Sequence, residues 1–239
     1  MALAHASTRL SPPNPISHVI KRSRTPATVR VGAMPVASAA GASPPRLARE
    51  KAIFLVCDVQ ERFRPVIHGF EHCVHVSSQM MRAAKILDVP VLVTEQYPEK
   101  LGATVDELQP NFAGEGVVRP AAAKKKFAMT VPEVDAALAE TPERTQAVIM
   151  GLEAHVCVLQ TALDLIARGY EVFVLVDGTS SQRTTDRAVA FRRLESAGAI
   201  LASSEMALFE MLGSADAPNF RDISALVREA RPEPPLPAV

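Results

Sequence analysis

The sequence predicts a three-layer, doubly wound α/β/α domain, in which helices cover both faces of a mostly parallel sheet of five to six strands. Short, nearly continuous apolar runs recur along the chain, and strands buried on both faces of a parallel sheet have this composition. Longer segments with a helical spacing of apolar residues separate these runs. This alternation is typical of β–α–β units, whose crossover helices lie against the sheet.

Taken in chain order, the apolar runs predict the strands. Five strands are expected at residues 52–57, 91–94, 147–150, 172–176 and 199–201. A sixth, short strand is expected near Val117 and Val118. In such sheets ligands bind at the carboxyl ends of the strands, so the residues that follow each run are the candidates for a functional site.

Helical spacing predicts the connecting helices. The apolar positions that define them are Val74, Met81, Ala84 and Leu87 in the first, Val156, Leu159, Leu163 and Ile166 in the second, and Val189, Leu194 and Ala197 in the third. Thr130 and Glu133 enclose Pro132, and this spacing predicts a further helix with a capping box at its start. Gly169 and Gly198 stand where a glycine commonly ends a helix.

The two ends of the chain differ in composition from the domain between them, residues 50–230. Residues 1–49 contain seven Lys or Arg and no Asp or Glu, and we expect this segment to be disordered because it buries too little apolar surface. Its composition is that of an organelle transit peptide, which predicts a mitochondrial protein; the alternatives are a chloroplast protein or a cytoplasmic one with an untargeted tail. Residues 231–239 contain four prolines and predict a second disordered tail.

The global charge favours no polyanionic partner. The 26 basic and 26 acidic residues cancel, so we expect no binding to nucleic acid or to an anionic membrane. No apolar run reaches the roughly 20 residues needed to cross a bilayer. The three cysteines, Cys57, Cys73 and Cys157, are too few for a disulfide framework, which indicates a reducing compartment.

Three residues near predicted strand ends could carry chemistry. Cys157 follows a strand and a tight turn at the start of a helix, where the helix dipole favours a thiolate; a buried, inert cysteine is the alternative. Asp58 ends an apolar run as a general base or as a turn aspartate. Lys124 begins a run of three lysines, and a cation beside the other two groups would favour the thiolate; the alternative is a solvated basic loop.

These residues lie in motifs that resemble one known family. VCDVQ at positions 56–60, K-x-x-F at 124–127 and GLEAHVCV at 151–158 resemble the isochorismatase-like hydrolase superfamily, with similarity from about Lys51 to Leu212. TEQYP at 94–98 is similar to the branch of isochorismatase domain-containing proteins. The resemblance implies a Rossmann-like fold of the isochorismatase type, and it implies a homo-oligomer, because members of the family often assemble.

The resemblance also implies a reaction. Cys157 would be the nucleophile, Asp58 the base and Lys124 the neighbouring cation, with Lys125 or Lys126 as alternatives for the lysine. The backbone N–H groups of Glu153 and Cys157 would form the oxyanion hole. The implied activity is covalent hydrolysis of a small carbonyl compound, an amide. Vinyl ether hydrolysis of the isochorismate type and a catalytically idle binding or oligomerisation module are the alternatives.

The pocket walls and the absence of cofactors complete the prediction. The expected substrate-binding residues are Gln60, Phe63, Gln96, Tyr97 and Asp177. No glycine-rich phosphate loop is present, which predicts no nucleotide cofactor. No metal is expected, because His68, His72 and His75 fit a solvated helix face. In addition, Glu95, Gln96 and Tyr97 stand where the nicotinamide-hydrolysing relatives have an aspartate and histidines.

Overall fold

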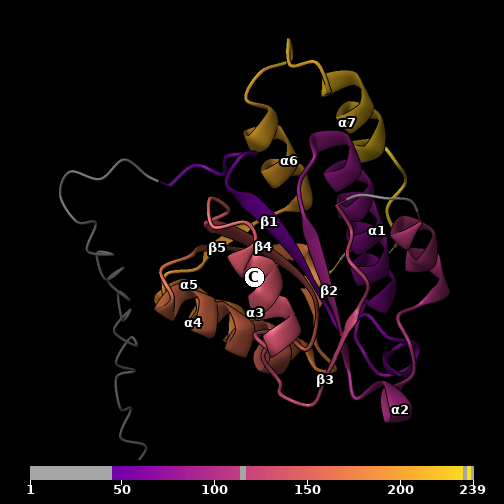
Figure 1. Ribbon diagram of the computed structural model, residues 1–239. Coiled ribbons are helices and arrows are strands. Elements are labelled where there is room, and N and C mark those ends of the chain that lie inside the picture. Colours follow the sequence, from indigo (N-terminus) through magenta and orange to yellow (C-terminus); the bar gives the residue numbers. More distant parts are fainter. Residues whose placement is uncertain (1–44, 114–116, 234–235, 238–239) are drawn as a thin grey trace, which may run out of the picture. The chain divides into compact units, whose positions relative to one another are not determined.

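A six-stranded, wholly parallel sheet forms the centre of the described chain (Figure 1). The strands are β1 (Ala52–Cys57), β2 (Val91–Gln96), β3 (Ala122–Lys124), β4 (Gln146–Leu152), β5 (Glu171–Ser180) and β6 (Ile200–Ala202). Their order is β3-β2-β1-β4-β5-β6. From β1 the chain first adds strands on one side of the sheet and then, from β4, on the other side. Ligands of doubly wound sheets bind beyond the carboxyl ends of the strands where the chain changes sides in this way. The predicted fold class is confirmed.

The computed structural model describes residues 45–113, 117–233 and 236–237. The chain divides into two units, Met1–Ser43 and Pro44–Val239, and the description concerns the second. The predicted disorder and targeting function of residues 1–49 therefore lie almost wholly outside the described residues. Within the described ranges, no helix is long and apolar enough to span a bilayer.

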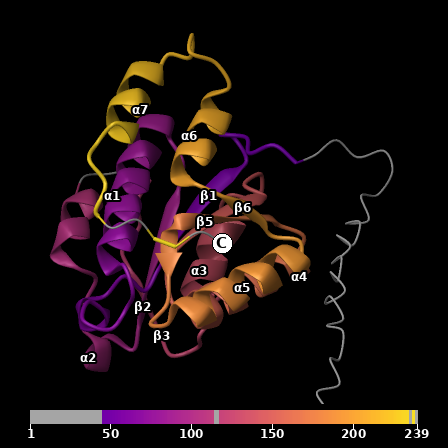
Figure 2. The ribbon, with the colours of Figure 1, turned by 180° about the vertical axis from the view of Figure 1, so that it is seen from behind.

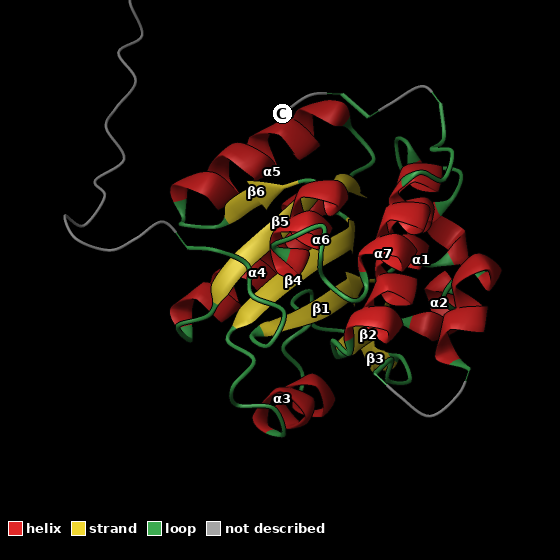
Figure 3. Cartoon of the chain, turned by 90° about the horizontal axis from the view of Figure 1, so that it is seen from above, coloured by secondary structure: helices red, strands yellow, loops and turns green. Residues whose placement is uncertain are grey.

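Helices cover both faces of the sheet (Figures 2 and 3). They are α1 (Phe70–Leu87), α2 (Pro98–Leu101), α3 (Pro132–Ala139), α4 (Leu159–Ala167), α5 (Thr184–Ser196), α6 (Ser204–Leu212) and α7 (Phe220–Val227). Two 3₁₀ helices (Glu61–Phe63 and Asp106–Phe112) and one π-helical turn (Ala154–Val158) complete the elements. Helices α1, α6 and α7 pack on one face of the sheet, and α3, α4 and α5 pack on the other.

The central strands supply both cores in alternation. Phe54 and Val56 of β1 join the core under α1, whereas Ile53 and Leu55 join the core under α3, α4 and α5. Successive side chains of a strand point to opposite faces of the sheet, so a strand between two helical layers is apolar at every position. This pattern explains why an uninterrupted apolar run marked the strand.

The sixth strand lies further along the chain than predicted. Val118 makes only an isolated bridge to Val91, and the strand itself is Ala122–Lys124, with Ala122 opposite Thr94. Three residues separate Val118 from Ala122, but two separate Val91 from Thr94, so the ladder is interrupted. Pro120, which has no N–H to donate, lies within the interruption.

Two helix predictions were wrong in detail. The residue before α3 is Val131 rather than Thr130, and its side chain makes no cap. The Thr130 hydroxyl donates to Asp164 at 2.6 Å. On α5, Val189 is 50% exposed, and the buried face carries Arg187 and Phe191 in its place. The Arg187 guanidinium donates to the Thr179 carbonyl at 2.9 Å, which turns a charged side chain toward the sheet.

Both flanks assigned to tails include residues that contact the domain. Leu47 is buried, and the Ala48 N–H donates to the Gln146 side chain at 2.7 Å. At the other end, Arg231 pairs with Asp177 at 2.7 Å, and the Pro237 carbonyl accepts from Arg187 at 2.8 Å. The packed domain therefore extends beyond residues 50–230 on both sides.

Gly151 of β4 lies where no side chain fits, and we expect Gly151→Ala to lower the free energy of unfolding by about 3 kcal/mol or more. Its φ is +127°, and a Cβ there would lie 2.2 Å from the Cys57 carbonyl oxygen of the neighbouring strand. Gly169→Ala is the matched control, since φ is +88° with nothing within 4 Å of a Cβ, and about 1–2 kcal/mol is expected. Urea unfolding of both variants measures the difference; equal losses would contradict the steric argument.

Candidate active site

A buried ion pair lies beyond the carboxyl ends of β1 and β3. Asp58 follows β1 with a positive φ of 54°, and its Oδ2 accepts from Lys124 Nζ, at the end of β3, at 2.7 Å. The side chains are 0% exposed for Lys124 and 1% for Asp58. Thr94 of β2 donates its hydroxyl to Asp58 Oδ1 at 2.8 Å. Both carboxylate oxygens are thus bonded, as a charge removed from water requires.

The ammonium group of Lys124 is held by oxygens on several sides. Beyond Asp58, its Nζ donates to Gln96 Oε1 at 2.6 Å and to the Phe127 carbonyl at 2.9 Å. Burial alone would lower the pKa of Lys124, but the neighbouring Cys57, Asp58 and Cys157 groups raise it, and the net pKa lies above its ordinary value. The lysine therefore stays charged at neutral pH.

The other two lysines of the run point elsewhere. Lys125 lies over the ring of Tyr97, with its Nζ 4.6 Å from the ring centroid, and Lys126 pairs with Asp164 at 2.9 Å. Of the three candidates named from the sequence, Lys124 is the one that reaches Asp58.

Cys157 lies in the π-helical turn that follows β4. The turn is set by Glu153, which has a φ of 57° and whose carbonyl accepts from the Val156 N–H at 2.9 Å. Thr161 of α4 donates its hydroxyl to the Cys157 carbonyl at 2.6 Å. The sequence predicted a regular helix here; π turns of this kind are frequent at functional sites. The thiol-bearing residue is 5% exposed.

A second cysteine, Cys57, is hydrogen-bonded to the ion pair. Its Sγ donates to Asp58 Oδ2 at 3.5 Å, and Cys157 belongs to the same buried cluster as Cys57. Burial first, then Cys157 and the Asp58 charge, raise the pKa of Cys57 well above its ordinary value. Among the described residues no hydrogen bond joins Cys157 directly to Asp58. Sequence reasoning placed Cys57 in a buried strand and missed this contact.

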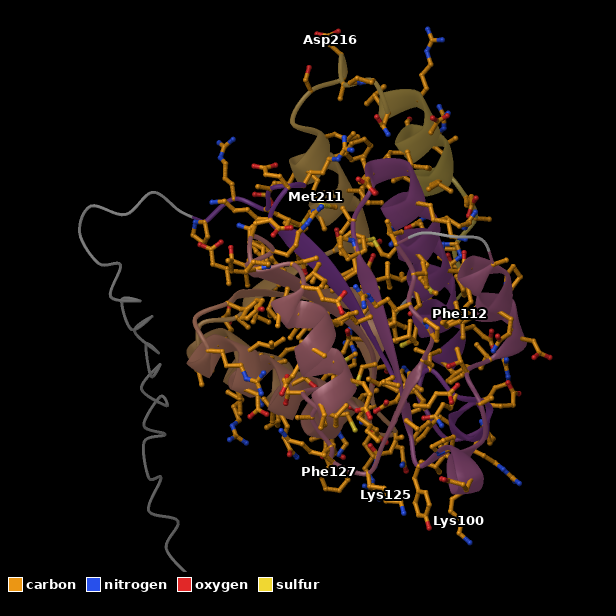
Figure 4. The ribbon with its side chains drawn as sticks, viewed as in Figure 1. Lys100, Phe112, Lys125, Phe127, Met211 and Asp216 are labelled. Atoms are coloured by element: carbon orange, nitrogen blue, oxygen red, sulfur yellow. The ribbon has the colours of Figure 1, made fainter. Side chains whose placement is uncertain are left out.

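A pocket of about 420 Å³ opens over Cys157. Three of the predicted wall residues, Phe63, Gln96 and Tyr97, line it together with Cys157. Phe127, Glu153 and His155 also line it, along with Lys100, Gln182, Arg183 and Asp186. Figure 4 shows Lys100, Lys125 and Phe127 projecting at one edge of the molecule.

Two predicted wall residues have other roles. Gln60 is fully buried, and its side chain accepts from the Gln96 N–H at 2.7 Å and donates to the Gln96 carbonyl at 3.1 Å, so it braces the end of β2. Asp177 accepts from the Ser204 N–H at 2.8 Å and pairs with Arg231. Asp177 lies within β5, which runs on to Ser180, rather than in a turn after it; its placement in the pocket was wrong.

Residues 52–206 match the family model described as the isochorismatase domain. The chain belongs to the isochorismatase family. It is 41% identical over 196 residues to isochorismatase domain-containing protein 2A of Mus musculus, covering 82% of this chain and 92% of the mouse protein. It is 43% identical over 182 residues to isochorismatase domain-containing protein 1 of Danio rerio, which covers 76% of this chain but only 62% of the fish protein.

A solved structure agrees with this family assignment. The MAR1 ribonuclease from Caenorhabditis elegans is 38% identical, with a TM-score of 0.73, over 82% of this chain and 100% of that chain. The architecture is that of the isochorismatase-like hydrolases. The resemblance stated from the three motifs is confirmed.

The isochorismatase domain also carries a polar wall that the sequence did not indicate. His155 Nδ1 lies 3.0 Å from the Ser181 hydroxyl and 3.2 Å from Glu153 Oε2. Glu153 and His155 belong to the GLEAHVCV motif, but the sequence alone does not show that the turn brings both side chains to the pocket. In the described ranges no group of three or more His, Cys, Asp or Glu residues could hold a metal ion.

Proposed function

We propose that this isochorismatase domain hydrolyses a small carbonyl compound, an amide, through a covalent intermediate on Cys157. The observation that carries the proposal is the buried Asp58–Lys124 pair, to which Cys57 is hydrogen-bonded. Cys157 belongs to the same buried cluster as Cys57 and lines the pocket. A nucleophile, a base and a fixed cation are the groups that acyl transfer requires. Homo-oligomerisation and a mitochondrial location stay predictions.

In the first half of the proposed reaction, the Cys157 sulfur attacks the carbonyl carbon and forms an S–C bond. Its proton passes to Asp58 by way of the Cys57 thiol, which is hydrogen-bonded to Asp58 and belongs to the same buried cluster as Cys157. The carbonyl oxygen takes the electron pair and is held by the backbone N–H groups of Glu153 and Cys157. The C–N bond then breaks, and Asp58 gives the proton to the leaving nitrogen.

In the second half, water cleaves the thioester. Asp58 takes a proton from the attacking water, the S–C bond breaks, and the product leaves as a carboxylic acid while the thiol regains its proton. Lys124 stays charged throughout and favours an ionised Asp58 carboxylate at the start of each half-reaction, when Asp58 must accept a proton. The whole cycle consumes one amide and one water and needs no oxidant or reductant.

Three other readings make different predictions. Vinyl ether hydrolysis of the isochorismate type would proceed without a covalent cysteine intermediate. A binding or oligomerisation module would show no reactive thiol. The similar worm structure is a MAR1 ribonuclease, so RNA is the third substrate to test; the present proposal expects no RNA cleavage that depends on Cys157.

The test is alkylation of the full chain by iodoacetamide between about pH 5 and pH 9, with the modified residue located by mass spectrometry. We expect Cys157 to be labelled faster than a free thiol peptide at neutral pH. Cys57 and Cys73 serve as internal controls, because burial raises the pKa of Cys73 to about 12 and that of Cys57 well above its ordinary value.

The labelled and unlabelled chains are then compared on a panel of small amides. Loss of amide hydrolysis in proportion to Cys157 labelling supports the proposal. Hydrolysis that survives complete labelling, or a Cys157 that reacts only after unfolding, would overturn it.

A further inference from the structure

The Glu153 carboxylate is an acidic group in the pocket that the proposed reaction does not use. The residue follows β4 in the left-handed conformation, with φ 57°, and its side chain is 11% exposed. The residue lines the same pocket as Cys157. A carboxylate held away from water is costly unless both of its oxygens are bonded.

Only one of the two oxygens is satisfied within the described chain. Glu153 Oε1 accepts from Gln182 Nε2 at 3.0 Å. Glu153 Oε2 is buried and accepts no hydrogen bond from a described residue. His155 Nδ1 is 3.2 Å away, but this nitrogen faces the Ser181 hydroxyl at 3.0 Å.

We propose that Glu153 Oε2 binds a nitrogen-bound hydrogen of the ligand, so that the pocket selects small molecules with an N–H donor beside the carbonyl or amidine carbon and rejects carboxylates. That the bound molecule is then hydrolysed rests on the proposed function. That Glu153 selects N–H-bearing ligands does not. A site that hydrogen-bonds a ligand N–H discriminates strongly against analogues that lack it, because its own buried group is then left unpaired.

The surroundings favour a donor over an anion. Lys124 is turned away into its own oxygen cage. Lys100 lines the pocket but is exposed, so solvent screens its charge. Arg183 lines the pocket, but its side chain is 79% exposed and lies 3.7 Å from Asp186, so solvent screens its charge. Asp186 in turn lies 4.0 Å from His155 Nε2, which adds a second carboxylate to the same wall.

The aromatic side chains of the pocket suit a flat ligand. Phe63, Tyr97 and Phe127 contribute to the lining, and a planar amide or amidinium group can stack on such rings while its N–H groups remain free to bond in its own plane. The Glu153 carboxylate then provides the in-plane acceptor. The ligand class is therefore planar, small and N–H-bearing, either neutral or cationic.

The experiment compares three ligands of the same shape: acetamidinium, acetamide and acetate. Binding to the full chain is measured by ligand-observed NMR on a Cys157→Ala background, which prevents turnover. We expect affinity in the order acetamidinium, acetamide, acetate. Glu153→Gln should reduce the preference of acetamidinium over acetate about tenfold or more. Glu99→Gln, which removes an exposed carboxylate outside the lining, should leave the order unchanged.

Acetate binding as tightly as acetamidinium, or an unchanged order in Glu153→Gln, would overturn the inference. Urea unfolding of Glu153→Gln distinguishes a role in ligand selection from a merely structural one. A merely structural role would lower the free energy of unfolding without changing the order of ligand affinities. The two proposals also fail separately. If the predicted order holds but wild-type protein hydrolyses no amide, the proposed function is wrong and the binding inference stands.

Discussion

Replacing Lys124 by methionine is expected to lower the free energy of unfolding by about 3–5 kcal/mol, because the partner charge would be left buried and unpaired. Asp58 and Lys124 are 2.7 Å apart with side chains 1% and 0% exposed, so water cannot replace the lost partner. The methionine fills a similar volume, so the effect reports the charge and not a cavity. Urea unfolding monitored by circular dichroism measures it.

The neighbouring residue provides the matched control. Lys125→Met removes the same charge one position along, where the ammonium lies over the Tyr97 ring, and about 1 kcal/mol or less is expected. Combining Lys124→Met with Asp58→Asn should recover part of the lost stability, since neither buried charge then remains. If Lys124→Met and Lys125→Met cost the same, the buried pair is not the source of stability that its geometry indicates.

The same pair sets an alkaline limit to stability. Folding raises the pKa of Lys124 above its ordinary value, so the folded protein holds this proton more tightly than the unfolded chain does. The stability contributed by the charged lysine is complete below the ordinary lysine pKa of about 10.4. It is lost as the pH rises through the raised value, and this alkaline loss should be absent in Lys124→Met.

The strands and the pairing of Asp58 with Lys124 could be predicted because the sequence marks them directly. Parallel strands buried on both faces are apolar at every position, so the first polar residue after each run lies at the ligand-binding edge. For Asp58, a buried carboxylate needs a cation, and the family motif supplied Lys124 as the candidate. The structure places these two in contact.

The direction of individual side chains could not be predicted in the same way. β5 continues to Ser180, past the predicted end at residue 176, and this extension keeps Asp177 in the strand, where it pairs with Arg231. Arg231 itself lay in a segment whose prolines predicted a tail. In the sequence, Cys57 was one of the apolar residues of a predicted strand. Only its hydrogen bond to Asp58 gives it a chemical role. Such contacts depend on long-range packing that no local pattern records.

Replacing Cys157 by alanine is expected to lower kcat for amide hydrolysis by about a thousandfold or more, because removing the nucleophile of a covalent mechanism removes the step itself. The backbone N–H groups proposed to hold the oxyanion and the Asp58–Lys124 pair would remain and leave only a small residual rate. Cys157 is nearly buried but touches the pocket, and alanine leaves a small cavity that should cost little stability.

Alanine variants of the two other cysteines distinguish the loss of the nucleophile from the loss of a neighbouring thiol. Cys73→Ala removes a thiol on α1 that does not line the pocket, and kcat should be unchanged. Cys57→Ala keeps the nucleophile but removes the thiol that is bonded to Asp58 and proposed to relay the proton of Cys157. A smaller loss is therefore expected, together with a changed pH dependence of kcat. Mass spectrometry of the wild-type chain mixed briefly with substrate should detect an acyl group on Cys157. A Cys157→Ala chain that retains full activity would exclude the thioester and leave Asp58 as a base acting directly on water or on a vinyl ether.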